Sequence, residues 1–258
     1  MALHSHKAAR PVGLPGRLHR FVGLAVLLLL WQNAALAVQS PLLPPVGAVA
    51  AALWRMTLSG ELLRHAAASL TTVLLGFGAA TVCGVSLGVL MAQSGTLRAL
   101  LTPPIDALRP IAALAFFPLL ILLFGIGQMS KAVVIFWTAW PAVLLSTVQG
   151  ILAVDAAVVE AAALDGAGRW RVLRHMALPL ALPTLLTGMR IGMSGGWIGL
   201  VSAEMLGSSA GLGHAVLAYS QSFQFAATYA AIVVIALCGL ALNQSLLYVQ
   251  TTIERKVL

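Results

Sequence analysis

The sequence predicts an all-α membrane protein with about six transmembrane helices. Of its 258 residues, 60% are hydrophobic and only 9% are charged, with a mean hydropathy of +0.97. A soluble domain carries about a quarter charged residues, so this composition favours a membrane protein. The apolar residues also gather in runs that approach the ~20 residues a membrane helix requires. Spanning backbone must satisfy its own hydrogen bonds, so such runs fold as helices.

The first 60 residues form a segment of their own. Four basic residues open it: Lys7, Arg10, Arg17 and Arg20. An apolar run follows at 21–38 and ends in Ala35-Leu36-Ala37, an order that also resembles a secretory signal peptide. The long apolar runs farther along favour a retained first helix. Prolines are dense in residues 39–60 and stop helices, so we expect a periplasmic loop there, with one short amphipathic helix.

Residues 61–250 predict a core of five helices, followed by a cytoplasmic tail at 251–258. The expected spans lie at about 66–92, 105–124, 131–153, 184–206 and 228–249. Residues 93–104 are interpreted as a short polar turn, and residues 125–130 as a tight connection. Within the first of these spans, Gly84 and Gly88 have the spacing that lets two membrane helices approach closely.

The positive charges predict the orientation of the chain. Six spans put both termini on one side, together with residues 93–104 and 155–183. If that side is the cytoplasm, only Arg55, Arg64 and Lys131 of the 15 Lys and Arg residues fall on the far side. Cytoplasmic loops carry an excess of Lys and Arg, so this orientation is expected. The same rule accounts for the net charge of +8, and no basic patch interleaved with aromatic residues indicates a nucleic-acid partner.

The segment from Asp155 to Pro183 is the longest run in the second half that cannot lie in a bilayer. Asp155 is a favoured helix N-cap, and good helix formers follow over 156–164. Gly166 and Gly168 then predict a reversal, because glycine adopts the backbone angles that a reversal needs. We therefore expect a first short helix and a turn.

A second short helix is expected over residues 169–177. Trp170, Leu173 and Ala177 recur along one face, which predicts an exposed Trp/Leu knob. Pro179 and Pro183 are expected to end this helix and to redirect the chain into the fifth span. From the residues alone, the two-helix loop either rests on lipid headgroups or docks a soluble partner.

Residues of this segment stand at a spacing found in a known family: Glu160-Ala161-Ala162, Gly166-Ala167, Leu173, Met176, Leu178-Pro179 and Pro183. The pattern resembles the EAA loop of the permease subunits of binding-protein-dependent ABC importers. Other stretches resemble the nitrate/sulfonate/taurine branch of these permeases: 108–110, 124–127, 197–201, 203–207 and 211–213. The resemblance covers roughly residues 60–250. Asp165 departs from it, since this branch more often has an apolar residue there.

The resemblance implies partners and a place in the cell. In that family the EAA loop forms coupling helices that seat in a groove of a cytoplasmic ATPase. The matching residues are Glu160, Ala161, Ala162, Gly166, Ala167, Trp170, Leu173 and Pro179. The family's assembly implies a permease homodimer, two ATPase subunits and a periplasmic substrate-binding protein. It also implies a bacterial inner membrane.

The chain lacks the motifs of an enzyme. The only lysines are Lys7, Lys131 and Lys256, and none follows a glycine as a phosphate-binding loop requires. No HExxH or GxSxG is present. Cys83 and Cys238 lie in apolar spans without further ligands at metal-binding spacing, so free thiols are expected. We expect a non-catalytic transport subunit without a cofactor of its own, with ATP and magnesium bound by a partner.

Two charges lie inside the fifth span. Arg190 and Glu204 are separated by thirteen residues, about 20 Å of helix, in a bilayer whose hydrocarbon core is about 30 Å thick. One or both must therefore snorkel or face a wetter interior, where they would contribute to a pathway. Arg109, expected at the cytoplasmic end of the third span, is explained by orientation alone and is not expected to bind substrate.

Four glycines of the same span predict close helix packing: Gly192, Gly195, Gly196 and Gly199. Such a face would also suit a dimer interface. The favoured function is a permease for a small oxyanion such as a sulfonate, taurine or nitrate. The alternatives are a permease for a vitamin precursor or other small organic solute and a secondary transporter driven by an ion gradient, although internal repeats typical of the latter are not evident.

Overall fold

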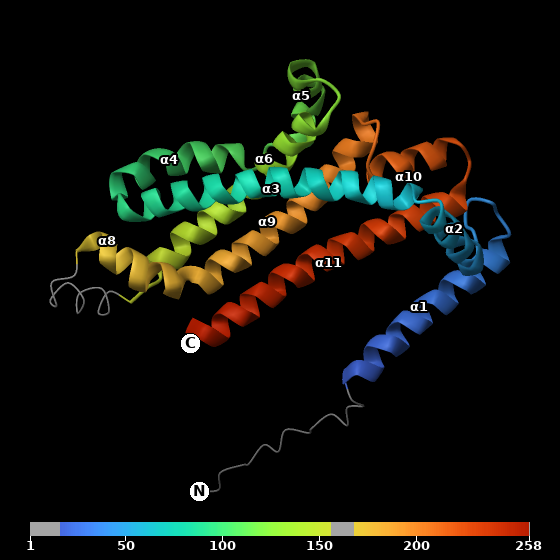
Figure 1. Ribbon diagram of the computed structural model, residues 1–258, viewed down its shortest axis with the longest axis horizontal. Helices are drawn as coiled ribbons and strands as arrows, with labels where there is room; N and C mark the ends of the chain where they lie inside the picture. The colour runs from blue at the N-terminus through green and yellow to red at the C-terminus, as the bar shows by residue number, and fades with distance from the viewer. Residues whose placement is uncertain (1–15, 156–167, 258) are drawn as a thin grey trace, which may run out of the picture.

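The computed structural model describes residues 16–155 and 168–257, and this part contains helices and no strand. The helices of the first half are α1 (Gly16–Val38), α2 (Val46–Leu58), α3 (Glu61–Gln93), α4 (Gly95–Leu108), η1 (Ala113–Phe116), α5 (Phe117–Phe124) and α6 (Gln128–Leu152). Those of the second half are α8 (Arg169–Val172), the π-turn η2 (Leu173–Ala177), α9 (Leu178–Gly207), α10 (Leu212–Gln221) and α11 (Phe225–Val257). α3, α9 and α11 run along the long axis of the molecule (Figure 1).

Within the described ranges, four helices are long and apolar enough to cross a membrane: Glu61–Gln93, Gln128–Leu152, Trp170–Gly207 and Phe225–Arg255. The bent pair Gly95–Leu108 and Ala113–Phe124 gives a fifth crossing if it counts as one span. α1 corresponds to the predicted first helix, with a shorter apolar part at Val22–Val38. The all-α membrane fold class is confirmed, and α2 is the short helix expected in the proline-rich segment.

The third predicted span is wrong as a continuous helix. α4 occupies residues 95–108, most of which were expected in a turn, and the chain then bends by 75° into η1 and α5. Ile105 is buried against Met91 of α3 and Leu144 of α6, and this packing holds α4 in a hairpin with α3. Pro110 has no backbone N–H to donate to the Asp106 carbonyl, so the helical hydrogen bonds of α4 end with the one from the Arg109 N–H to the Ile105 carbonyl.

α6 lies between α3 and α9 and approaches both closely. On α3, a Cβ added at Gly84 would lie 3.0 Å from the Val143 side chain, and one at Gly88 would lie 2.7 Å from Thr147 Cβ. On α9, Gly192 and Gly196 face the Ala139 carbonyl and the Ile135 side chain, at 2.9 and 3.0 Å from an added Cβ. Gly195 and Gly199 face Thr138 in the same way, at 3.3 and 3.2 Å. The four glycines of the fifth span thus lie on the face of α9 that contacts α6.

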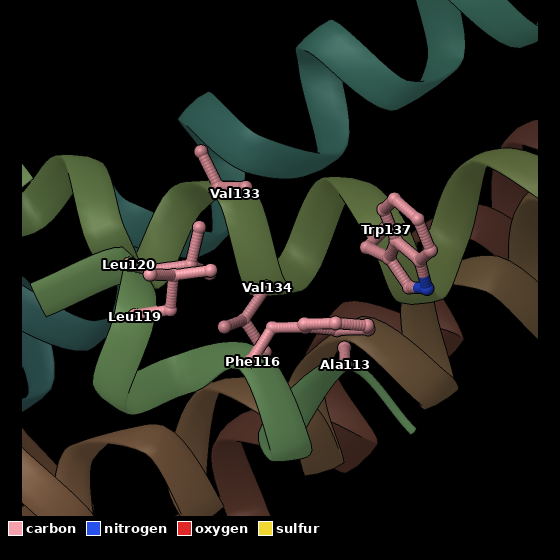
Figure 2. A pocket seen from close by; sticks show the side chains of 7 residues that line it. All are labelled: Ala113, Phe116, Leu119, Leu120, Val133, Val134 and Trp137. Carbon is pink, nitrogen blue, oxygen red and sulfur yellow. The ribbon is translucent and has the colours of Figure 1, made fainter. Parts of the chain in front are cut away.

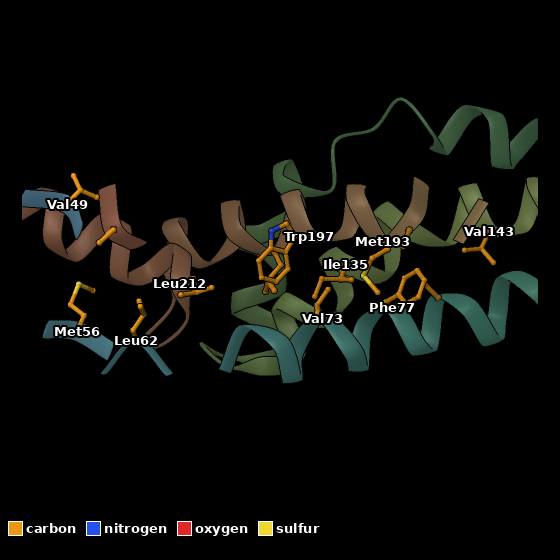
Figure 3. Close-up of a cluster of buried hydrophobic side chains, with 14 of the residues drawn as sticks. Val49, Met56, Leu62, Val73, Phe77, Ile135, Val143, Met193, Trp197 and Leu212 are labelled. Atoms are coloured by element: carbon orange, nitrogen blue, oxygen red, sulfur yellow. The ribbon is translucent and has the colours of Figure 1, made fainter. Parts of the chain in front are cut away.

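A continuous apolar cluster fills the space between these helices (Figure 3). Trp197 of α9 packs with Ile135 of α6 and Val73 of α3, and Gly239 of α11 leaves room for its indole ring. A second part of the cluster joins α2, α3 and α10 through Met56, Leu62 and Leu212. This core fixes the ends of α3, α6 and α9, where the polar residues discussed below lie.

α8, η2 and α9 form one uninterrupted helical rod from Arg169 to Gly207. The prediction that Pro179 and Pro183 end a separate second helix is therefore wrong. In the π-turn, the Leu178 N–H donates to the Leu173 carbonyl, one residue farther back than in an α-helix. A π-bulge widens the turn next to Pro179, where the proline ring would otherwise meet the preceding turn. The helix can thus continue through both prolines.

Candidate functional site

The predicted coupling segment is only partly within the described residues. Glu160, Ala161, Ala162, Gly166 and Ala167 lie outside them, as does the expected first helix after Asp155. Trp170 is 66% exposed at the start of the rod, and Pro179 is half-buried nine residues later. Leu173 is buried, so the predicted exposed Trp/Leu knob is wrong in its second member. The buried face of this helix consists of Val172, Leu173 and Ala177, and Trp170 is not part of it.

The exposed face of this end of the rod is basic. Arg171, Arg174 and His175 are exposed, and the His175 Nδ1 atom lies 3.1 Å from the Arg171 carbonyl oxygen. A shallow pocket lies between Arg171, Val172, His175 and Met176. Together with Trp170, these residues form an aromatic and cationic surface that a soluble protein with acidic and apolar groups could contact.

At the other end of the rod, Glu204 is the centre of a buried polar cluster. Its carboxylate accepts hydrogen bonds from Ser69 Oγ of α3, at 2.8 and 2.9 Å, and from the Gly213 backbone N–H, at 2.9 Å. The Ser69 hydroxyl also accepts a bond from the Leu212 N–H at 2.9 Å. Glu204 and Ser69 are both completely buried. The carboxylate thus caps the first turn of α10, where orphan N–H groups and the helix dipole favour a negative charge.

The loop between α9 and α10 is shaped by glycine. Gly211 has φ +119°, and a Cβ at this position would collide with the Glu204 carboxylate. A Cβ at Gly213 would collide with the Val201 carbonyl. The Gly211 N–H donates to His65 Nδ1 of α3 at 3.2 Å. No residue with a side chain fits these two positions without displacing the buried acid.

Lys131 completes this cluster from α6. The residue is 4% exposed, and its Nζ donates to Ser208 Oγ at 2.9 Å and to the Ala210 carbonyl at 3.4 Å. Its charge also attracts that of Glu204. Lys131 was predicted at the start of the fourth span, as one of three positive charges on the far side of the membrane. The structure instead buries it among loop acceptors, and its bonds to Ser208 and Ala210 tie α6 to the loop between α9 and α10.

Arg190 does not take part in the Glu204 cluster. Its Nε donates to Asn243 Oδ1 at 3.4 Å, and its Nη1 donates to Gln250 Oε1 at 3.3 Å, both on α11. Gln250 in turn bonds Thr187 and Glu254. These contacts form a polar ladder between α9 and α11 on the side toward the C-terminus.

A third polar region lies at the bend between α4 and η1. Arg109 there is 55% exposed and forms an ion pair with Asp106 at 3.6 Å. A pocket of about 310 Å³ opens beside it, lined by residues 109–113 and by Trp137, Thr138, Pro141 and Ala142 of α6. An apolar pocket of about 190 Å³ adjoins it, and the two share Ala113 and Trp137 as lining residues (Figure 2).

The expected position of Arg109 at the cytoplasmic end of a span is wrong. α4 has 14 residues and returns along α3 from the hairpin turn at Ser94. At about 1.5 Å per residue, Arg109 lies about 21 Å back along the hairpin. Thr138, Pro141 and Ala142, which line the pocket beside it, belong to the middle of the 25-residue helix α6. Residues 93–104 were predicted to be a turn, but most of them belong to α4, and this helix carries Arg109 toward the middle of the span.

Comparison with known proteins decides what kind of protein carries these features. The family described as "Binding-protein-dependent transport system inner membrane component" matches residues 84–258. The chain belongs to this family. The match includes the bend, the coupling segment, the rod and the Glu204 loop. The chain is therefore a multi-pass permease of the ABC importer class.

Relatives cover most of this permease. It is 38% identical over 232 residues to the taurine transport system permease protein TauC of Escherichia coli (strain K12), covering 86% of the chain and 84% of TauC. It is 33% identical over 233 residues to the riboflavin transport system permease protein RibX of Chloroflexus aurantiacus, covering 90% of the chain and 85% of RibX. A chain of the MetNI methionine ABC transporter, solved in inward-facing conformations, has the same fold, with a TM-score of 0.65, 19% identity and coverage of 76% of this chain and 96% of that chain.

The sequence did not predict the contact between Glu204 and Ser69, or that between the Gly211 N–H and His65. The signals that were present are the isolated lysine at the start of a span and two glycines flanking Leu212. A buried Lys and a buried Glu on different apolar helices are costly when isolated, which predicts that both lie in one polar cluster.

Proposed function

We propose that this permease forms the translocation pathway of an ATP-driven importer and is coupled to a cytoplasmic ATPase through residues 155–183. The observation that carries the proposal is the family match over residues 84–258, which contains this whole segment. Two copies would form the pathway, with two ATPase subunits below and a periplasmic binding protein above. The permease itself does no covalent chemistry and needs no cofactor, because the ATPase binds ATP and magnesium.

The shape of the rod supports the coupling role. The helix Trp170–Gly207 has 38 residues, so it is about 57 Å long at about 1.5 Å per residue. A movement of the exposed end at Trp170 reaches the Glu204 loop without an intervening hinge loop. Close packing of α9 on α6 would carry the same movement to α6 and α3. A rigid element of this kind transmits a push that a flexible loop would absorb.

The orientation follows from the coupling role. The ATPase is cytoplasmic, so the coupling segment and the start of α8 lie on that side. The hairpin turn between α3 and α4 lies at the same end of the molecule as α8 (Figure 1). Both termini are proposed to be cytoplasmic as well, in a bacterial inner membrane, and residues 39–60 with α2 on the periplasmic side.

Co-purification tests the ATPase partnership. A tagged permease extracted in mild detergent should bring down the ATPase, and substitution of Gly166 or Glu160 by Trp should remove it while the permease stays in the membrane. Trp170→Ala should weaken the interaction, and Trp54→Ala, an equally exposed tryptophan on α2, serves as the matched control. Absence of an ATPase from the wild-type preparation would sink the proposal.

For the substrate, we propose a small organic oxyanion of the sulfonate or taurine type. The similarity to TauC supports this class, and a similarity to the bicarbonate transport system permease protein CmpB of Synechococcus elongatus keeps an inorganic oxyanion such as nitrate within the same class. The similarity to RibX favours a second candidate, a vitamin-like organic solute. Mass spectrometry of the ligand that copurifies with the partner binding protein separates the two, and a ligand that carries no oxyanion group would contradict the oxyanion proposal.

A further inference from the structure

We propose that the bend at residues 109–113 is an anion-binding station of the translocation pathway, with Arg109 as the charged group and the Phe116–Trp137 pocket as the place for a short apolar chain. This inference rests on the proposed function and deepens it. It assigns the substrate as an organic anion whose charged head and apolar portion are adjacent, such as a short alkanesulfonate.

The first argument is the position of the arginine. The pocket beside Arg109 is lined from the middle of α6, so the guanidinium lies far from either end of that span. An arginine at such depth is costly unless it faces a protein-lined, wetter space. Its ion pair with Asp106 does not remove it from that space, because the two side chains remain 55% and 53% exposed. The group is therefore available to a ligand.

The second argument is the broken helix. Backbone that leaves a helix at membrane depth is tolerated where it is buried in protein or lines an aqueous cavity. The bend of 75° between α4 and η1 places residues 109–113 in this condition, and these residues line the larger pocket. Discontinuous helices near the middle of a membrane are a general way to build substrate sites, because they supply free backbone groups.

The third argument is the neighbouring apolar pocket. Ala113, Phe116, Leu119, Leu120, Val133, Val134 and Trp137 line it, and Figure 2 shows the Phe116 and Trp137 rings beside each other in this lining. The two ring centroids are 5.9 Å apart, so the rings contact each other and form one apolar wall of the pocket. The Trp137 Nε1 group is already satisfied by the Ile111 carbonyl at 3.3 Å, so the indole offers an apolar face. A guanidinium beside such a pocket matches an oxyanion with a short apolar chain better than a bare inorganic anion.

Uptake by the complete importer tests this station. The permease, its ATPase and its binding protein are reconstituted in proteoliposomes, and ethanesulfonate and taurine are the transported probes. Arg109→Gln should lower the uptake of both about tenfold or more, since one charge-assisted bidentate contact is lost. Arg109→Lys should retain part of the activity, and Arg98→Gln on the same helix α4, which lines neither pocket, should leave uptake unchanged.

A chemical measurement tests the same site without transport. In a Cys83→Ala, Cys238→Ala background, Ala112→Cys places a thiol in the lining of the larger pocket. Relative to the rate of each reagent with a free thiol in solution, a sulfonate-bearing methanethiosulfonate should react with this thiol faster than its trimethylammonium analogue, and Arg109→Gln should reduce the rate ratio severalfold. A lipid phosphate would be attracted by the same chemistry. Loss of a bound phospholipid from the Arg109→Gln complex in native mass spectrometry, with unchanged uptake, would show a lipid site and overturn the proposal.

The outcomes also separate this inference from the proposed function. If the wild-type importer takes up taurine and Arg109→Gln does so equally well, the proposed function stands and the station is wrong. If the wild-type importer does not transport taurine, the substrate proposal fails, and the reagent rates alone decide whether the site attracts organic anions. A rate ratio that Arg109→Gln leaves unchanged contradicts the station in either case.

Discussion

The Glu204 cluster and the Arg109 bend both place charge within the spanning part of the permease, but they treat that charge differently. Glu204 is completely buried, and its carboxylate accepts hydrogen bonds from Ser69 and Gly213. Arg109 is more than half exposed beside a pocket, with a single long ion pair to Asp106. The Glu204 carboxylate is occupied by hydrogen bonds within the protein, whereas the Arg109 guanidinium is open to a ligand.

A charge on a membrane-spanning helix therefore need not serve binding. A buried charge whose partners are all internal holds helices together, and losing one partner leaves the others unpaired. A charge that lines a pocket contributes little to stability and remains free for binding. Stability and transport should therefore respond oppositely to substitutions in the two regions. The stability effects below all refer to unfolding of the purified permease by sodium dodecyl sulfate titration in mild detergent.

Glu204→Ala should have the largest effect, a loss of about 3–5 kcal/mol of stability, because the Ser69 hydroxyl and the Gly213 N–H would be left buried without their acceptor and Lys131 would lose the nearby opposite charge. The matched control is Glu254→Ala, which removes a half-buried carboxylate bonded to Gln250 on α11. Equal unfolding midpoints for the two variants would mean that the Glu204 cluster does not hold the helices together.

Gly211→Ala should cause the second largest loss of stability, and Gly60→Ala is its control. Both glycines have positive φ, +119° and +73°, but only Gly211 lies where a Cβ meets the Glu204 carboxylate, and Gly60 has open space. Backbone strain alone should cost about 1 kcal/mol at Gly60. Displacing the carboxylate from its donors should raise the cost at Gly211 to about 3 kcal/mol. The difference between the two variants isolates the contact, and a difference of zero would contradict it.

Arg190→Ala should have a smaller effect, a loss of about 1 kcal/mol. Its hydrogen bonds to Asn243 and Gln250 are long, at 3.4 and 3.3 Å, and the side chain is only half-buried. Asn243→Ala in combination with Arg190→Ala gives a double-mutant cycle for this ladder. A cost as large as that of Glu204→Ala would place Arg190 among the main structural charges.

Arg109→Gln should have the smallest effect on unfolding, within about 0.5 kcal/mol, because an exposed ion pair stabilises little. The same variant should show the large loss of uptake described above. A strongly destabilised Arg109→Gln permease would remove the contrast between the two regions.

Sequence alone predicted the features that depend on local composition. The apolar runs gave α3, α6, α9 and α11, and the spacing of Gly192 to Gly199 predicted a closely packed helix face. It did not predict features that depend on contacts between distant residues. Ser69 and Glu204 are separated by 135 positions, so no local pattern connects them.

Proline was the second source of error, because its effect depends on packing and on neighbouring turns. Pro103 and Pro104 lie inside α4, Pro110 follows its end, and Pro179 and Pro183 lie inside the rod. The sequence treats all five alike. α4 continues through its two prolines because Ile105 is buried against α3 and α6. The rod continues through Pro179 because a π-turn precedes that proline. Because α4 is helical, Arg109 lies beside a pocket in the middle of a span and not at the predicted end.

The source of energy for uptake tests the central claim most directly. The permease, ATPase and binding protein are reconstituted in proteoliposomes, with nucleotide enclosed on the ATPase side and taurine outside. The account predicts that uptake requires ATP, stops when ADP replaces it and persists when ionophores dissipate ion gradients. Uptake that continues without ATP and collapses with an ionophore would identify a gradient-driven transporter and contradict the account.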